Sequence, residues 1–226
     1  WCEKYLHRIP VIYLSDETYS EDQWIKDTDH FEWRLKRFGD IFVSIILTII
    51  SLPIIIIAGI LIWFEDKGPI FYSQVRTGFN NKSFTIIKLR TMKILSEKNG
   101  PVWASKNDSR ITNTGKILRK TRIDELPQLI SVLIGDMSLI GPRPERPEIE
   151  LTLKREIPFY EIRYKVKPGL SGWAQVNYPY GASVKDSENK ISYDFFYIRN
   201  YSFLLDILIF IKTLKTIFNM KGSNPS

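Results

Sequence analysis

The sequence has almost none of the residues that build disulfide frameworks or zinc sites. Cys2 is the only cysteine, and His7 and His30 are the only histidines among the 226 residues. A single cysteine excludes an intrachain disulfide, and the scarcity of both residue types excludes a cysteine-rich zinc site. Any chemistry must therefore come from carboxylates, lysine or arginine, hydroxyl groups, or a hard metal ion held by oxygen ligands.

Several motifs are absent as well. The chain contains no Walker A pattern and no G-x-G-x-x-G, H-E-x-x-H or G-x-S-x-G sequence. RNA-binding signatures are also missing, so we expect no nucleic acid among the partners. The first 20 residues carry charges and no long apolar run, so no signal peptide is visible there. The 44% of hydrophobic and 25% of charged residues exclude a disordered chain and suit one or two folded domains.

Charge is distributed unevenly along the chain. Residues 1–64 carry 6 basic and 9 acidic side chains, whereas residues 65–226 carry 26 basic and 16 acidic ones. The second part should therefore attract an anionic partner, such as phosphates or an anionic membrane face. The chain also begins with Trp1 rather than Met, which indicates a piece of a longer protein. Residues 1–34 are expected to be a linker from a missing N-terminal region, with a disordered tail as the alternative.

Residues 41–64, IFVSIILTIISLPIIIIAGILIWF, form a run of 24 residues without a charge. At ~1.5 Å per residue, a helix of this length can cross a hydrocarbon core of ~30 Å. A core helix of a soluble protein is the alternative, and the uniform apolarity disfavours it. Ser51 and Pro53 interrupt the run near its centre. Proline removes a backbone donor, and the serine hydroxyl can bond to the backbone that is freed there.

The flanks of this run favour a re-entrant anchor. Arg34, Lys36 and Arg37 precede the run, and the strongly basic region follows it. Because positively charged flanks tend to remain in the cytoplasm, both flanks should lie there. A helix that breaks at Ser51–Pro53 and returns to the same face satisfies this condition, whereas a single straight crossing does not. We therefore predict a broken, re-entrant membrane helix over residues 35–64, with a full span as the alternative.

The remaining patterns predict an α+β fold that is mostly helical. Two short strands joined by a turn at GFNNKS are expected between residues 70 and 95. Between Leu126 and Ile134, apolar residues recur at helical spacing and form one apolar face. The stretch SFLLDILIFIKTLKTIFNM, residues 202–220, suits an amphipathic helix that lies in the membrane interface or packs on the core.

Asp124 and Glu125 are adjacent candidate catalytic carboxylates. Neighbouring side chains point in different directions on a helix, so one can act as a nucleophile or base while the other binds Mg²⁺. The alternative is structural, because acidic residues are favoured at a helix N-terminus. In that case Asp124 is the N-cap of a helix whose first turn contains Pro127.

Five basic residues are candidates for binding phosphate: Lys88, Arg90, Arg119, Arg122 and Arg143. An arginine presents a planar fork that matches the oxygens of a phosphate group. Arg143 stands between two prolines, and this rigid backbone lowers the entropic cost of presenting its guanidinium group. Ordinary solvated charges are the alternative for each of these residues taken singly.

Longer stretches of the sequence resemble the bacterial sugar transferases, the monotopic polyprenyl-phosphate phosphoglycosyl transferases. In chain order, they are KRFGDIFVSIILTIISLPIIII, GPIFYSQVRTGFNNKSFTIIKLRTM, RITNTGKILRKTRIDELPQLISVLIGDMSLIGPRP, VKPGLSGWAQVN and DFFYIRNYSFLLDILIFIKTLKTI. Their order and spacing across residues 35–218 make the resemblance specific. The sequence departs from many members after QVN, where it reads YPYGASVKDSENK instead of an Asn-Gly-Arg type sequence, and at Ser171, where Thr is common. The identity of the sugar is therefore left open.

The resemblance implies a reaction and roles for the two acidic residues. A UDP-sugar gives its sugar-1-phosphate to polyprenyl (undecaprenyl) phosphate and UMP is released. This is the first lipid-linked step in the assembly of exopolysaccharide, capsule or glycan. By resemblance, Asp124 is the nucleophile that forms a covalent phosphosugar, and Glu125 is a ligand of Mg²⁺.

The resemblance also extends to the basic and C-terminal acidic residues. Lys88, Arg119 and Arg143 are expected to bind phosphate, and Arg90 belongs to the same basic set. Asp194 and Asp206 match acidic positions in the C-terminal motif of the family. For these two carboxylates, structural pairing with a nearby arginine or lysine is the alternative.

We therefore expect residues 65–226 to form a catalytic domain on the cytoplasmic face of the bacterial inner membrane. Membrane lipids, and a second copy of the chain in a homo-oligomer, are expected as further partners. The rival from another class is a non-enzymatic, membrane-anchored basic module that binds lipid headgroups or acts as a scaffold. This rival explains the anchor and the charge, but it does not explain the DELPQL and GPRP stretches. A two-carboxylate glycosyl hydrolase is a second, enzymatic rival.

Overall fold

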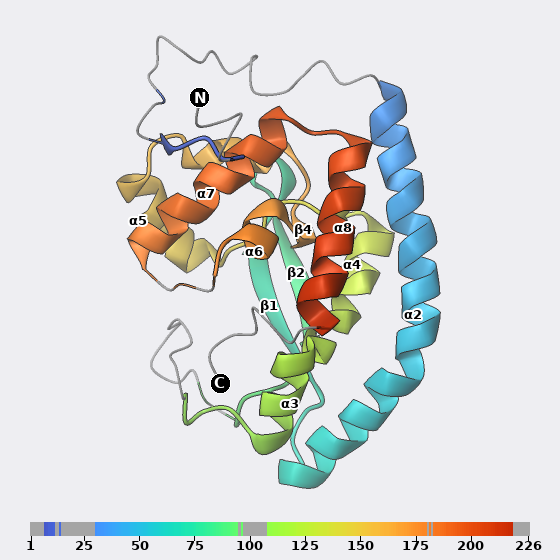
Figure 1. Ribbon diagram of the computed structural model, residues 1–226. Coiled ribbons are helices and arrows are strands. Elements are labelled where there is room, and N and C mark those ends of the chain that lie inside the picture. The colour runs from blue at the N-terminus through green and yellow to red at the C-terminus, as the bar shows by residue number, and fades with distance from the viewer. Residues whose placement is uncertain are drawn as a thin grey trace.

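The computed structural model describes residues 7–11, 14, 30–94, 96, 108–179, 181 and 183–218. A long helix, α2 (His30–Asp66), runs along one side of the molecule, and a central hairpin lies beside it (Figure 1). Three helices pack against α2: α3 (Asn113–Thr121), α4 (Leu129–Ile134) and α8 (Phe203–Phe218). On the side away from α2 lie α5 (Pro147–Glu156) and α7 (Val184–Arg199). The predicted α+β, mostly helical fold is confirmed.

Helix α2 continues through Ser51 and Pro53 without a gap in its helical assignment. The Ser51 hydroxyl donates to the carbonyl of Thr48 at 3.2 Å, which is the kind of backbone bond expected beside a proline. Figure 1 shows that α2 bends along its length, so a bend within one helix replaces the predicted break. By length and composition, residues 31–66 can cross a membrane, because the most apolar window has a mean hydropathy of 3.0 and is only 22% buried. The helix is thus compatible with a membrane anchor.

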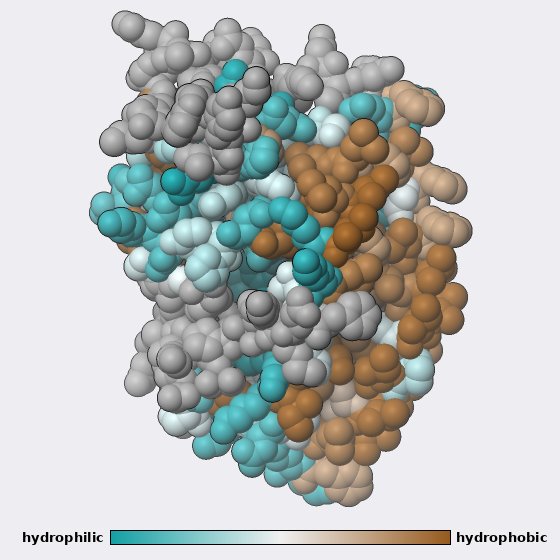
Figure 2. All heavy atoms as spheres, in the orientation of Figure 1, coloured by the Kyte–Doolittle hydropathy of each residue, from teal (hydrophilic) through white to brown (hydrophobic). Residues whose placement is uncertain are grey.

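Apolar side chains of α2 and α8 gather on one side of the molecule (Figure 2). On α8, Leu204 and Ile211 are exposed while Ile209 is completely buried in the core. The C-terminal helix predicted from the sequence is therefore present, but both of its faces are apolar. One face packs on the core, and the other extends the apolar surface of α2. A surface of this kind marks contact with a membrane or another protein.

The hairpin pairs β1 (Phe71–Thr77) with β2 (Ser83–Leu89) in antiparallel register, as the sequence predicted. Its turn is a short 3-10 segment, η3 (Phe79–Asn81), in which both asparagines adopt positive φ. Because side chains alternate along a strand, Tyr72, Gln74 and Arg76 share one face of β1. Lys88 lies opposite Tyr72 in the register, so it joins the same face from β2.

A second, two-stranded parallel sheet pairs β3 (Ser138–Ile140) with β4 (Gly169–Ser171). The core around it includes Val132, Met137 and Phe195, which have no exposed surface. Ile9, Val11 and Leu14 also belong to this core, so the described residues of the predicted 1–34 linker take part in the fold. The predicted membrane segment, 35–64, lies inside the longer α2.

The close approach of β3 and β4 leads to a stability prediction. A Cβ atom on Gly169 would lie 2.1 Å from the backbone nitrogen of Gly141, far inside contact distance. Gly169→Ala should therefore push the two strands apart and lower the free energy of unfolding by at least ~1–3 kcal/mol. Thermal unfolding of the detergent-solubilised protein measures the effect.

Gly39→Ala is the matched control for this substitution. Its Cβ would meet nothing closer than Phe203 Cε2 at 3.9 Å, and alanine is favoured over glycine inside a helix by ~0.5–1 kcal/mol. We expect the midpoint temperature of thermal unfolding to be unchanged or raised for Gly39→Ala. Equal midpoints for the two variants would contradict the close approach of the strands.

Candidate active site

The chain presents Asp124 and Glu125 through a sharp change of direction. Helix α3 starts at the N-cap Thr112, whose side chain accepts a hydrogen bond from Gly115 N at 2.9 Å. It ends at Arg122, which adopts the left-handed conformation with φ of 61°. For a residue other than glycine, this conformation is uncommon, and such strain concentrates at functional sites. The short helix η4 (Ile123–Gln128) follows directly and carries both carboxylates.

The N-cap interpretation of Asp124 is wrong. The residue that precedes η4 is Arg122, and Asp124 lies inside the helical turn. Both carboxylates are buried, with 8% exposure for Asp124 and 9% for Glu125. A capping carboxylate at a helix end usually remains accessible to water, so burial of both acids requires another explanation.

The two carboxylates line a cavity of about 620 Å³ between the hairpin, η4 and α7. The structure brings together in its lining all seven residues that the sequence analysis named as candidates for catalysis or phosphate binding: Lys88, Arg90, Arg119, Arg122, Asp124, Glu125 and Arg143. Further basic side chains in the lining are Arg76, Lys93, Arg146, Arg163 and Lys190, whereas Glu145 and Asp194 are the only other acids there among the residues that the structure describes. The cavity is therefore strongly basic and suits a ligand with several negative charges.

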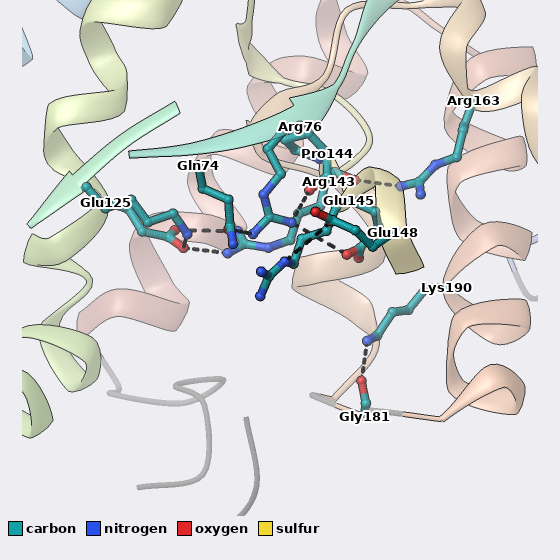
Figure 3. Close-up of polar contacts among 12 residues, drawn as sticks. Gln74, Arg76, Glu125, Arg143, Pro144, Glu145, Glu148, Arg163, Gly181 and Lys190 are labelled. Atoms are coloured by element: carbon teal, nitrogen blue, oxygen red, sulfur yellow. Dashed lines mark hydrogen bonds and ion pairs between the residues drawn. The ribbon is translucent and has the colours of Figure 1, made fainter. Parts of the chain in front are cut away.

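Glu125 is surrounded by cations (Figure 3). Its Oε1 accepts a bond from Arg143 Nη2 at 2.5 Å and lies 3.4 Å from Lys88 Nζ. Its Oε2 lies 3.5 Å from Arg143 Nη1 and 3.8 Å from Arg122 Nη1. Burial by itself would raise the pKa of Glu125, but the charges of these three cations outweigh burial and hold the pKa well below its ordinary value. Glu125 is thus ionised at neutral pH.

Asp124 has the opposite environment. Its Oδ1 is buried and has no hydrogen-bond partner among the described residues. Burial and the neighbouring charge of Glu125 raise the pKa of Asp124 to about 6, although Lys88, Arg119 and Arg122 act in the other direction. At neutral pH the carboxylate is therefore mostly ionised, poorly solvated and open toward the cavity. A buried, unsatisfied charge of this kind is costly for stability and typical of a reactive group.

The other residues predicted to bind phosphate differ in their environment and in the protein groups that they already bind. Burial lowers the pKa of Lys88 to about 8, against the attraction of Glu125. Arg119 Nε donates to Thr91 Oγ1 at 2.8 Å. Arg90 directs both of its terminal nitrogens at the carboxylate of Asp66, so its guanidinium group lines the cavity but is already paired with the end of α2.

The two C-terminal carboxylates have different locations. Asp194 lines the cavity and accepts a bond from Arg163 Nη2 at 3.2 Å. Asp206 is bound by Lys36 Nζ at 2.6 Å and by the Tyr197 hydroxyl at 2.8 Å, and it is not among the cavity-lining residues. Both carboxylates are therefore paired with a basic residue, Asp194 with Arg163 and Asp206 with Lys36. This is the structural pairing stated above as the alternative.

Sequence reasoning missed several cavity residues as parts of the site, and three of them bind backbone carbonyls. Arg76 donates to the Pro144 carbonyl at 3.0 Å, and Arg163 donates to the Arg143 carbonyl at 2.6 Å (Figure 3). Lys190 donates to the Gly181 carbonyl at 2.6 Å. The only hint for Arg163 was its place in the aromatic stretch FYEIRYK, because a charge among core residues must be paired. No comparable pattern around Arg76 or Lys190 marks either residue as part of the site.

The donor set fits a divalent cation that shares its coordination with a phosphate ligand. Mg²⁺ usually takes one or two carboxylates and completes its shell with substrate phosphates and water. The pKa of Glu125 lies well below its ordinary value, and the adjacent Asp124 has an oxygen without a partner among the described residues. Among the described residues there is no group of three or more histidines, cysteines or acidic residues that could hold a metal. Within the part of the chain that the structure describes, this carboxylate pair would therefore supply the protein's ligands.

Comparison with known proteins finds relatives whose sequences are similar to this chain. The family model for "Bacterial sugar transferase" matches residues 31–220. The chain is 46% identical over 189 residues to the UDP-N-acetylgalactosamine-undecaprenyl-phosphate N-acetylgalactosaminephosphotransferase of Aeromonas hydrophila, covering 84% of the chain and 45% of that protein. It is also similar to the UDP-glucose:undecaprenyl-phosphate glucose-1-phosphate transferases of Klebsiella pneumoniae and Escherichia coli.

The identities to these two proteins are 38% and 35%, over 81% and 82% of the chain and 40% of each relative. The chain thus spans less than half the length of these three relatives. The matched region includes α2, the hairpin, the acidic pair and α8, which are the parts that build the cavity and the apolar surface. On this evidence, the chain belongs to the bacterial sugar transferase family.

Proposed function

We propose that the chain is the catalytic part of an undecaprenyl-phosphate sugar-1-phosphate transferase. The observation that carries this proposal is the buried Asp124, whose carboxylate has an unpartnered oxygen in a cavity lined mainly by cations. A diphosphate group brings the negative charge that these cations are arranged to offset. The related proteins act, by their names, on UDP-sugars and undecaprenyl phosphate.

In the proposed reaction, Asp124 attacks the phosphorus atom that carries the sugar. An Asp124 oxygen forms a bond to this phosphorus, the bond to the bridging oxygen of the diphosphate breaks, and UMP leaves with the electron pair. A phosphate oxygen of undecaprenyl phosphate then attacks the same phosphorus and displaces the aspartate carboxylate. The product is undecaprenyl diphosphate sugar, and Asp124 is regenerated. Its raised pKa of about 6 makes it a more basic nucleophile that is still mainly ionised at neutral pH.

The cations around Asp124 have separate tasks in this proposal. Lys88 and Arg143 are bound to Glu125 in the structure, and they would turn their remaining donors toward the diphosphate. Arg119 would bind a phosphate oxygen from the side of α3. Glu125, with Asp124 beside it, would hold Mg²⁺, which when bound would neutralise charge on the diphosphate and on the departing UMP. A lipid-binding scaffold, the rival function, gives no reason to bury an unpartnered carboxylate.

We further propose that α2 is a re-entrant anchor on the cytoplasmic face of the bacterial inner membrane. The bend in α2 and the basic flanks support this geometry, together with the exposed apolar side chains of α2 and α8. Such an anchor would keep the cavity at the membrane surface, where a soluble UDP-sugar and a lipid phosphate can both reach it. Exopolysaccharide, capsule or glycan assembly would begin with this step.

The first prediction from the proposed function concerns the nucleophile. Asp124→Asn should abolish lipid-dependent UMP release, because the amide cannot form the phosphosugar intermediate, while membrane association should be unchanged. The measurement uses detergent-solubilised protein with Mg²⁺, undecaprenyl phosphate and a panel of UDP-sugars. EDTA should stop the reaction of the unmodified protein. The matched control is Asp136→Asn, which lies at an exposed position just after α4 and should retain full turnover. Full turnover by Asp124→Asn overturns the assignment.

The second prediction follows from the raised pKa of Asp124. The carboxyl group binds a proton more tightly in the folded state, with a pKa of about 6, than at its ordinary value of 3.8. Its contribution to stability is therefore lost as pH rises from ~4 to ~6. Asn resembles the protonated acid, so Asp124→Asn should be more stable than the unmodified protein by about 2–3 kcal/mol at pH 7.5.

The stability difference should shrink as pH falls toward 4, where both side chains are neutral. Thermal or denaturant unfolding at pH 7.5 and pH 4.5 measures it. Asp136→Asn again serves as the control, because an exposed carboxylate should show no such gain. A destabilised Asp124→Asn protein at pH 7.5 contradicts the burial penalty assigned to Asp124.

The third prediction concerns the re-entrant anchor. Cys2 is the only native cysteine, so Cys2→Ser provides a background for single-cysteine labelling. Arg34→Cys before the apolar run and Lys116→Cys after it both lie at exposed positions. In right-side-out and inverted membrane vesicles, an impermeant maleimide should label both positions from the same side. Labelling from opposite sides establishes a full span instead.

A further inference from the structure

The segment from Pro142 to Glu145 carries Arg143 to the acidic pair, and it has no secondary structure of its own. Pro142 and Pro144 have no N–H group, so this segment cannot form a regular ladder. Each of its carbonyls is held from another element. Those of Pro142, Arg143, Pro144 and Glu145 accept hydrogen bonds, in this order, from Gly169 N (2.9 Å), Arg163 Nη2 (2.6 Å), Arg76 Nη1 (3.0 Å) and Thr77 N (3.2 Å).

Arg163 has an unusual place among these donors. Its side chain is only 7% exposed, and a buried guanidinium group requires partners for its charge and its donors. Asp194 supplies the charge at 3.2 Å, and the Tyr160 hydroxyl accepts a bond from Nη1 at 2.6 Å. The same Nη2 that contacts Asp194 also binds the Arg143 carbonyl. A hydrogen bond therefore joins the Arg163–Asp194 ion pair to the backbone of Arg143, whose side chain binds Glu125.

We propose that Arg163, held in place by Asp194, is a positioning residue that fixes the backbone of Arg143 and so aims its guanidinium group at the diphosphate site. This inference rests on the proposed function of the cavity. It gives Asp194 a supporting task rather than a place in the reaction itself. Figure 3 shows the arrangement: Arg163 approaches the segment from the side opposite to Glu125, and the Arg143 side chain extends between them.

The chemistry explains why an arginine suits this position. The planar fork contacts an anion and a carbonyl at the same time, and its geometry is fixed by the guanidinium plane. A lysine at 163 retains the charge for Asp194, but its ammonium group cannot also hold Tyr160 and the carbonyl at these positions. Arg143 then loses one of its backbone restraints. A displacement of about 1 Å in a positioned group is enough to weaken its action strongly.

A double-mutant cycle tests the proposal, with UDP as the probe and its dissociation constant measured by isothermal titration calorimetry. Arg163→Lys should weaken UDP binding about tenfold, the order of one charge-assisted hydrogen bond. In an Arg143→Met background the same substitution should have less than a twofold effect, because residues that act through one another are not additive. Arg155→Met, at an exposed position of α5, is the control and should leave UDP binding unchanged.

A second variant covers the case in which Arg163→Lys does not fold, as judged by thermal unfolding. Asp194→Asn keeps an oxygen acceptor of the same shape, and it should show the same dependence on Arg143 with a smaller loss. Equal losses in the two backgrounds, or no loss in a folded variant, overturn the positioning role while leaving the proposed function intact. If the unmodified protein itself does not bind UDP, the proposed function fails and the inference fails with it.

Discussion

The charge of the buried Glu125 carboxylate is the constraint on which the site depends. An uncompensated carboxylate at this depth would cost several kcal/mol, so cations must meet it from more than one element. Lys88 comes from β2, Arg122 from the end of α3 and Arg143 from the proline-bounded segment. The hairpin, η4 and the segment 142–145 are therefore fixed relative to one another by one charge. This arrangement also builds a basic cavity before any ligand arrives.

Two neighbouring carboxylates acquire different chemistry from this arrangement. The cations that neutralise Glu125 lower its pKa, whereas Asp124 lies beside the resulting anion and its pKa rises to about 6. Environments that push the pKa values of a pair apart are a general way to assign two tasks to two identical groups. The left-handed Arg122 matters here, because it ends α3 and sets the direction in which both side chains enter the cavity.

Much of this arrangement was predictable from local sequence, and the remainder was not. The hairpin follows from alternation around GFNNKS, and the family resemblance pointed to the acidic pair and to Lys88, Arg119 and Arg143, which line the same cavity. The N-cap interpretation of Asp124 failed because Arg122 adopts a conformation that no propensity signals. The roles of Arg76 and Arg163 escaped detection because they bind carbonyls of residues 68 and 20 positions away. Contacts of this range depend on the tertiary fold alone.

The end of the apolar helix is joined to the site by two adjacent acids. The carboxylate of Glu65 accepts bonds from the backbone nitrogens of Asn113 and Thr114, at 2.8 and 3.1 Å, and so supports the first turn of α3. Asp66 holds the fork of Arg90 just after β2. Since α3 carries Arg119 and β2 carries Lys88, the anchor is bonded to both elements that supply cations from this side. In the proposed function, these bonds would link the depth of α2 in the membrane to the placement of the cations that meet the phosphate of the lipid.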